Sequence, residues 1–97
     1  MSRRISVPEK LKLYLEGNIE ESCSTKPSYI TRVKLDLVKS VVGKFREKCD
    51  ELTTIGGVMF KCSKNESRIT FTVGNGRLVV EASDAEEALR LLENILT

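Results

Sequence analysis

The chain has 97 residues, of which 40% are apolar, and its 16 Lys and Arg residues nearly balance its 14 Asp and Glu residues. This length supports one small folded domain, and the charge balance excludes both a disordered acidic chain and a purely basic nucleic-acid arm. The sequence contains no histidine, which excludes imidazole-based catalytic triads and the zinc sites that need His. We therefore expect no enzyme activity, no cofactor and no metal.

The three cysteines, Cys23, Cys49 and Cys62, are odd in number and include no C-x-x-C pair. This number and spacing of cysteines predict neither a disulfide framework nor a thiolate metal site, and they favour a protein of the reducing cytosol. Cys49 and Cys62 fall on apolar stripes and are predicted to be buried or inert thiols, whereas Cys23 has no assigned place. No apolar run approaches the roughly 20 residues of a membrane helix, and the first residues lack the apolar stretch of a signal peptide. We expect a cytoplasmic protein without a membrane partner.

The N-terminal part begins with Ser6-Val7-Pro8-Glu9, a pattern that favours a capped helix start. The predicted helix ends at Gly17-Asn18, although Leu11, Leu13 and Leu15 also alternate as they would in a strand. Residues 18–28 are polar without periodicity, which predicts a connector. We therefore expect residues 1–28 to form an N-terminal extension with a short helix and a polar connector, and residues 29–97 to form a single α+β domain.

The domain begins with alternating apolar residues over 29–35, which predict a half-buried strand. Asp36 is placed to cap a following helix. One 3.6-residue stripe predicts that this helix spans residues 38–54, and Gly56-Gly57 is predicted to end it. The stripe consists of Val38, Val41, Val42, Phe45, Cys49 and Leu52.

Three strands and a final helix follow in the predicted order. Alternation predicts strands over 58–63, 68–73 and 77–82, the last two joined by the hairpin turn Gly74-Asn75-Gly76. Ser83-Asp84-Ala85-Glu86 is a predicted capping box for the final helix. The buried stripe of this helix is predicted to be Ala85, Ala88, Leu89, Leu92, Ile95 and Leu96.

The apolar faces of these elements predict an α+β two-layer sandwich, with a mainly antiparallel sheet and the helices against one of its faces. Phe45 and Phe71 should then lie in one core. The other sheet face is predicted to be open and basic, with five positive residues among eleven. Its members are Ile30, Arg32, Lys34, Met59, Lys61, Arg68, Thr70, Thr72, Arg77, Val79 and Glu81.

Three interpretations of this open face remain. It is an ordinary solvated sheet face, or it contacts RNA phosphates through its basic residues, or it docks a protein partner or a second copy. The RNA-binding candidates are Arg32, Lys34, Lys61, Arg68 and Arg77, and the apolar partner-binding candidates are Ile30, Met59 and Val79.

The final helix offers a second candidate surface, because Leu91 lies outside the predicted buried stripe. Either Leu91 widens that stripe, or it anchors a docking surface for a larger subunit. The residues of that surface are Glu87, Arg90, Leu91 and Asn94.

The order strand, helix, strand, strand, helix resembles KH-type RNA-binding domains, and Val42-Gly43-Lys44-Phe45 lies where such domains carry a G-x-x-G clamp. The second glycine is missing, so the KH mode of RNA binding is not inferred. Residues 66–96 resemble the small dimerising subunit of the KEOPS complex, which makes threonylcarbamoyladenosine in tRNA. The matching segments are Ser67-Arg68-Ile69-Thr70-Phe71, Gly76-Arg77-Leu78-Val79-Val80, Ser83-Asp84, Leu89-Arg90 and Asn94.

This resemblance implies a non-catalytic subunit that pairs through its sheet and presents its helices, around Leu89, Arg90 and Asn94, to a catalytic subunit. Departures from the family include Leu37-Val38, where the family usually has Pro-Phe, and the extra strand at 58–63. The leading functional hypothesis is a non-catalytic assembly or dimerisation subunit of an RNA-processing or tRNA-modifying complex. The alternative is a stand-alone RNA-binding domain that uses the basic open face.

Overall fold

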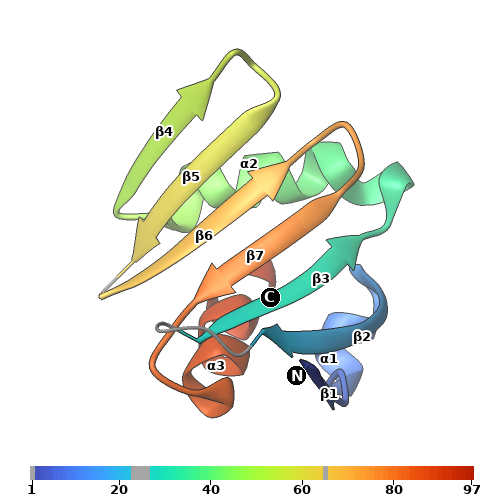
Figure 1. Cartoon of the computed structure of the whole chain (residues 1–97). Helices are drawn as coiled ribbons and strands as arrows, with labels where there is room; N and C mark the ends of the chain where they lie inside the picture. The colour runs from blue at the N-terminus through green and yellow to red at the C-terminus, as the bar shows by residue number, and fades with distance from the viewer. Residues whose placement is uncertain (1, 23–26, 65) are drawn as a thin grey trace.

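The computed structural model describes residues 2–22, 27–64 and 66–97, which form an α+β fold with a seven-stranded sheet and three α-helices (Figure 1). In chain order the elements are β1 (Ser2–Ile5), α1 (Glu9–Lys12), β2 (Leu15–Ser22), β3 (Ser28–Val33), the 3-10 helix η1 (Leu35–Leu37), α2 (Val38–Lys48), β4 (Glu51–Ile55), β5 (Met59–Lys64), β6 (Ser67–Thr72), β7 (Arg77–Glu81) and α3 (Ala85–Leu96).

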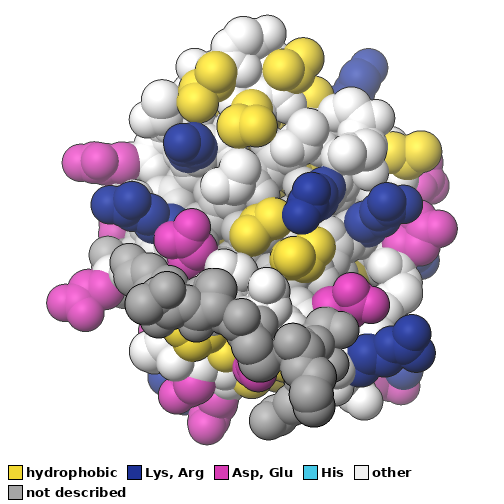
Figure 2. Space-filling view, in the orientation of Figure 1, with side chains coloured by type: hydrophobic (Ala, Val, Ile, Leu, Met, Phe, Trp, Pro, Cys, Tyr) yellow, Lys and Arg dark blue, Asp and Glu magenta, His cyan; other side chains and the backbone are white. Residues whose placement is uncertain are grey.

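The strands lie in the order β1-β2-β3-β7-β6-β5-β4, and every neighbouring pair is antiparallel. Figure 1 views the sheet from the face opposite the helices, all of which lie behind it. Figure 2 shows the side chains of this open face. The predicted α+β class, with an antiparallel sheet and helices on one face, is confirmed. Two strands, β4 and β5, separate α2 from the β6–β7 hairpin, so the five-element order that resembles KH domains is interrupted.

A single core lies between the helices and the sheet. The helices contribute Val41 and Phe45 from α2 and Ile95 from α3, while the strands contribute residues such as Phe71 and Leu78, all fully buried. The rings of Phe45 and Phe71 pack with their centroids 5.6 Å apart and their planes tilted by 52°. The prediction that these two aromatic residues share one core is confirmed.

The N-terminal part differs from its prediction. The helix α1 ends at Lys12 rather than near Gly17, and its N-cap is Pro8, without a side-chain cap from Ser6. The chain instead enters β2, which takes in part of the predicted polar connector; residues 23–26 of that connector lie outside the described residues, as does Cys23. Because β2 pairs with both β1 and β3, its backbone forms hydrogen bonds on both sides. This pairing outweighs the weak local preference of the β2 segment for a helix.

The strand β2 is hard to recognise because its outward side chains are polar. Ile19 is buried in the core, while Glu16 and Glu20 lie exposed on the open face. A bulge between Glu16 and Glu20 breaks the regular alternation, and Gly17 adopts φ +77° there. Residues 2–22 therefore belong to the same sheet and core as the rest of the chain.

The helix α2 is also shorter than predicted, because residues 51–55 form β4 instead of its last turns. Asp36 lies in η1 and provides no side-chain cap; the N-cap of α2 is Leu37. Cys49 adopts an extended conformation that ends the helix. Gly56 and Gly57, at φ +61° and +72°, form the β4–β5 turn rather than a helix end. Thus the predicted stripe continues only as far as Phe45 on the helix.

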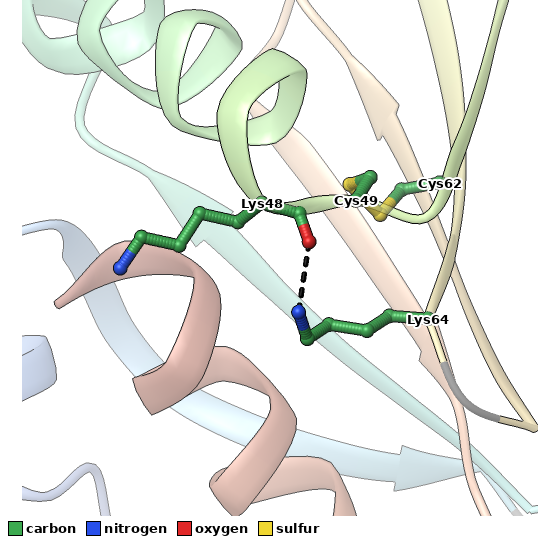
Figure 3. The surroundings of a disulfide bond; sticks show 4 residues. All are labelled: Lys48, Cys49, Cys62 and Lys64. Atoms are coloured by element: carbon green, nitrogen blue, oxygen red, sulfur yellow. Dashed lines mark hydrogen bonds between the residues drawn. A yellow bond between two sulfur atoms is a disulfide. The ribbon is translucent and has the colours of Figure 1, made fainter.

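Cys49 and Cys62 form a disulfide with their Cα atoms 5.7 Å apart, which corrects the prediction of free thiols (Figure 3). The bond joins the end of α2 to β5, and Lys64 Nζ donates a hydrogen bond of 2.8 Å to the Lys48 carbonyl beside it. An ammonium at this position also satisfies a free carbonyl at the helix C-terminus. Because disulfides persist mainly in oxidising compartments, the cysteines no longer support the predicted reducing cytosol.

The C-terminal half follows its prediction closely: β5, β6, β7 and α3 occupy the expected segments within one or two residues. Gly76 adopts φ +71°, and a Cβ there would lie 2.5 Å from the Val33 carbonyl oxygen, so the turn into β7 requires glycine. Asp84 is the N-cap of α3 and accepts a hydrogen bond of 2.8 Å from the Glu87 N–H. The predicted cap was Ser83, one residue earlier.

Candidate functional site

The candidate site is the open face of the sheet, which antiparallel register assembles from alternate residues of the strands. In its centre, Val79 of β7 lies directly opposite Ile30 of β3 on one side and Thr70 of β6 on the other. Ile30 and Val79 are both half-buried, although no helix covers them. They form the apolar centre of the face.

The third predicted apolar residue, Met59, is not part of this centre. It lies on β5, opposite Thr72 of β6 and Ile55 of β4. Ile55 and Val58 are 46% and 56% exposed near the β4–β5 turn. The face therefore has two separate apolar groups, a central one and one near that hairpin turn, with other side chains between them (Figure 2).

Four of the five predicted RNA-binding residues lie exposed on the open face, namely Arg32, Lys61, Arg68 and Arg77. The fifth, Lys34, follows the last residue of β3, and its N–H donates to the Tyr14 carbonyl at 2.9 Å. Lys34 is half-buried and lies just beyond the end of β3, where the chain turns into η1 after Val33.

Arg32 and Arg77 are direct cross-strand neighbours. Within the part of the chain that the structure describes, neither guanidinium forms an ion pair. Like charges placed opposite each other weaken a sheet, so this pair is not explained by the stability of the fold.

Acidic residues on the same face correct the prediction of a basic surface. Register places Glu16 opposite Arg32, Glu20 opposite Arg4 and Ile30, and Glu81 opposite Arg68. Glu51 of β4 lies opposite Ser63 of β5, which in turn lies opposite Arg68 of β6, so Glu51 is on the same face. Sequence reasoning missed these residues, apart from Glu81, because it did not recognise β2 and β4. Figure 2 shows acidic and basic groups side by side around the apolar centre.

Two shallow depressions mark the open face, of about 440 Å³ and 200 Å³. Arg32, Arg77 and Asn75 border the larger one together with Glu16 and Glu20. Asn75 Oδ1 accepts a hydrogen bond of 2.9 Å from the Arg77 N–H and so holds the turn beside it. Both depressions mix acidic and basic walls, which suits polar contacts with another macromolecule better than the binding of one small ion.

The described residues carry neither a metal-ligand cluster nor a helix that could span a membrane. In that part of the chain, no three His, Cys, Asp or Glu side chains gather in a way that could hold a metal ion. None of the helices described is long and apolar enough to cross a membrane.

Leu91 is only 4% exposed and belongs to the core. It is therefore not available as the apolar centre of the predicted docking surface on α3. Both α1 and α2 pack against α3, and this widens the buried stripe to include Leu91 while Leu89 is only partly buried. Arg90 is exposed and pairs with Glu86 and Glu87 at 3.3 and 3.5 Å. With Asn94 also exposed, what remains is an ordinary charged helix surface.

The open face therefore brings together four of the five predicted RNA-binding residues and the three apolar partner-binding candidates, Ile30, Met59 and Val79, whereas the α3 candidates lie on the helical side. Comparison with known proteins adds no further assignment: the chain matches no family model, and no curated protein or solved structure is detectably similar to it.

Proposed function

We propose that this protein is a non-catalytic assembly module that pairs with a second copy of itself through the open face of its sheet. The observation that carries the proposal is the Ile30–Val79 pair, which lies at the centre of an uncovered sheet face within a ring of charged side chains. An apolar centre inside a charged rim is the usual arrangement of a protein interface.

A second copy is favoured by the charge pattern along β7. This strand presents Arg77, Val79 and Glu81 in a row on the open face. A two-fold axis that runs perpendicular to the strands at Val79, in the plane of the interface, would pair Val79 with Val79 of the second copy. The same axis would place Arg77 of each copy opposite Glu81 of the other. Two sheets commonly pack face to face in this way.

The size of the face also fits a pair. The molecule measures 32 × 25 × 22 Å along its principal axes, so its largest cross-section is on the order of 800 Å², about what each partner buries in a stable complex. The nearly balanced charges of the face favour a protein over RNA, since a phosphate backbone selects an excess of positive charge.

The broader setting of the proposal comes from the resemblance of residues 66–96 to the small KEOPS subunit. That resemblance favours an RNA-processing or tRNA-modifying complex, in which this module pairs through its sheet and presents its helices to a larger subunit.

Replacing Val79 with aspartate is expected to raise the dissociation constant of the pair by at least roughly thirtyfold, as for a central interface residue. The two-fold arrangement would bring two introduced carboxylates together in a poorly solvated centre. Sedimentation equilibrium of the wild type and the V79D variant measures the change.

The matched control is Val79→Thr, which keeps the β-branched shape and should retain most of the self-association. Circular dichroism and thermal unfolding should show that both variants remain folded. A wild type that stays monomeric at all accessible concentrations would contradict the proposal, as would equal association of wild type and V79D.

A second candidate function, RNA binding by the open face, is supported by the neighbouring guanidinium groups of Arg32 and Arg77. If this face binds tRNA, replacing Arg32, Arg68 and Arg77 with serine should reduce the salt dependence of binding by roughly one unit for each phosphate that the variant no longer neutralises. Filter binding or fluorescence anisotropy over a salt series measures the slope.

The control for RNA binding removes the same charge from the helical side of the molecule, through Lys39→Ser, Arg46→Ser and Arg90→Ser, all exposed positions. The slope should then stay close to that of the wild type. Absence of tRNA binding at low salt, or equal slopes for both triple variants, would remove this alternative.

A further inference from the structure

A different surface lies at the end of the sheet where β2 begins and β3 ends (Figure 1). Leu13 and Leu35 are 69% and 66% exposed there, more than the other large apolar side chains that are exposed in the described residues. They come from separate turns, one after α1 and one at the start of η1. The Lys34 N–H donates to the Tyr14 carbonyl at 2.9 Å, so the chain segments that carry the two leucines are held side by side.

The chain segments that carry these leucines are rich in lysine. Lys12 precedes Leu13 and Lys34 precedes Leu35 in the chain. Lys44 Nζ lies 5.4 Å from the centre of the Tyr14 ring, which brings a third ammonium to the same end. Residues 9–16 and 34–44, the segments that carry the two leucines, together contain five lysines and three carboxylates: Lys10, Lys12, Lys34, Lys39 and Lys44 against Glu9, Glu16 and Asp36.

We propose that this end of the sheet docks on an anionic lipid surface, with Leu13 and Leu35 entering the headgroup region and the lysines contacting lipid phosphates. Exposed apolar side chains within a basic surround are what binding to such a surface requires. In this mode the protein lies on the membrane and does not cross it, so no spanning helix is needed.

A lipid surface fits these leucines better than a peptide partner does. Neither leucine borders the depressions of about 440, 350 and 200 Å³ described in this structure, so none of these hollows lies beside them to receive a peptide side chain. Projecting side chains with adjacent ammonium groups suit a soft, negatively charged surface. A second copy is disfavoured because the lysines of two copies would repel.

The chain supplies its own control patch. Ile55 and Val58 are also exposed, by 46% and 56%, at the β4–β5 hairpin. Their neighbours from Thr53 to Met59 carry no charge. The register of this hairpin brings one lysine to the same face, Lys61 opposite Thr53, so the patch offers apolar surface with fewer lysines than the leucine end of the sheet.

The test is co-sedimentation of the full chain with vesicles of phosphatidylcholine alone or mixed with phosphatidylserine. The wild type should bind the mixed vesicles more strongly, and added salt should weaken that binding. Replacing both Leu13 and Leu35 with serine should lower the partition coefficient by about tenfold for each leucine, and Lys12→Gln with Lys34→Gln by about fivefold for each lysine. Replacing Ile55 and Val58 with serine should change it less than about twofold.

The proposal is overturned if the wild type does not bind phosphatidylserine vesicles at low salt, if it binds both vesicle types equally, or if the Ile55 and Val58 variant loses as much binding as the leucine variant. Self-association through the open face should be unchanged in the leucine variant, so the two proposals can fail independently.

Discussion

Replacing Phe45 or Phe71 with alanine is expected to lower the free energy of unfolding by roughly 3 to 5 kcal/mol. Both rings are fully buried and pack against each other across the helix–sheet interface, with centroids 5.6 Å apart. Truncating either ring leaves a cavity that surrounding side chains fill only in part. A loss of this size is a large share of the total stability of a small domain, about 5 to 15 kcal/mol.

Chemical denaturation of the two variants, monitored by circular dichroism, measures the loss. The matched control is Leu13→Ala, because Leu13 is exposed and its truncation should change the free energy of unfolding by less than about 0.5 kcal/mol. Losses below about 1 kcal/mol for both phenylalanines would mean that α2 does not pack on β6 as described.

The second large effect is expected from the Cys49–Cys62 disulfide, which closes a loop with a sequence separation of 13. Removing the bond frees this loop in the unfolded chain, which should cost about 3 kcal/mol in stability. A reducing agent should therefore lower the melting temperature of the wild type, and the Cys49→Ala, Cys62→Ala double variant should melt at a similarly low temperature.

The double variant is also the control for the reducing agent, which should leave its melting temperature unchanged. Alkylation of the folded protein without reductant should spare Cys49 and Cys62, as peptide mass spectrometry would show. Rapid labelling of both cysteines would contradict the disulfide.

The sequence predicted the C-terminal half well because local and tertiary signals agree there. Gly76 marks the hairpin, strict alternation marks β6 and β7, and Asp84 marks the start of α3. The helix α2 was predicted too long because Cys49 and Leu52 continue its 3.6-residue pattern. The disulfide and the pairing of β4 with β5 turn that segment into a strand, and neither is visible in local periodicity.

The candidate site was predicted in part for the same reason. The placement of Ile30, Val79, Arg32 and Arg77 on one face follows from alternation within single strands, which the sequence displays. Their neighbours across strands depend on sheet order. The acidic residues of β2 and β4 were therefore missed, and with them the mixed charge of the face. Of the two alternatives for Leu91, the structure confirms the one in which it widens the buried stripe; the packing of α1 on α3 that decides between them could not be read from the helix alone.

Hydroxyl-radical footprinting of the wild type at low and high protein concentration tests the central claim, self-pairing through the open face, most directly. Side-chain oxidation of Ile30 and Val79 should fall as the concentration rises, while oxidation of the exposed Leu13, which follows α1 on the helical side of the sheet, should stay constant in the absence of lipid. Unchanged oxidation of Ile30 and Val79, or protection confined to the helical side of the molecule, would contradict the claim.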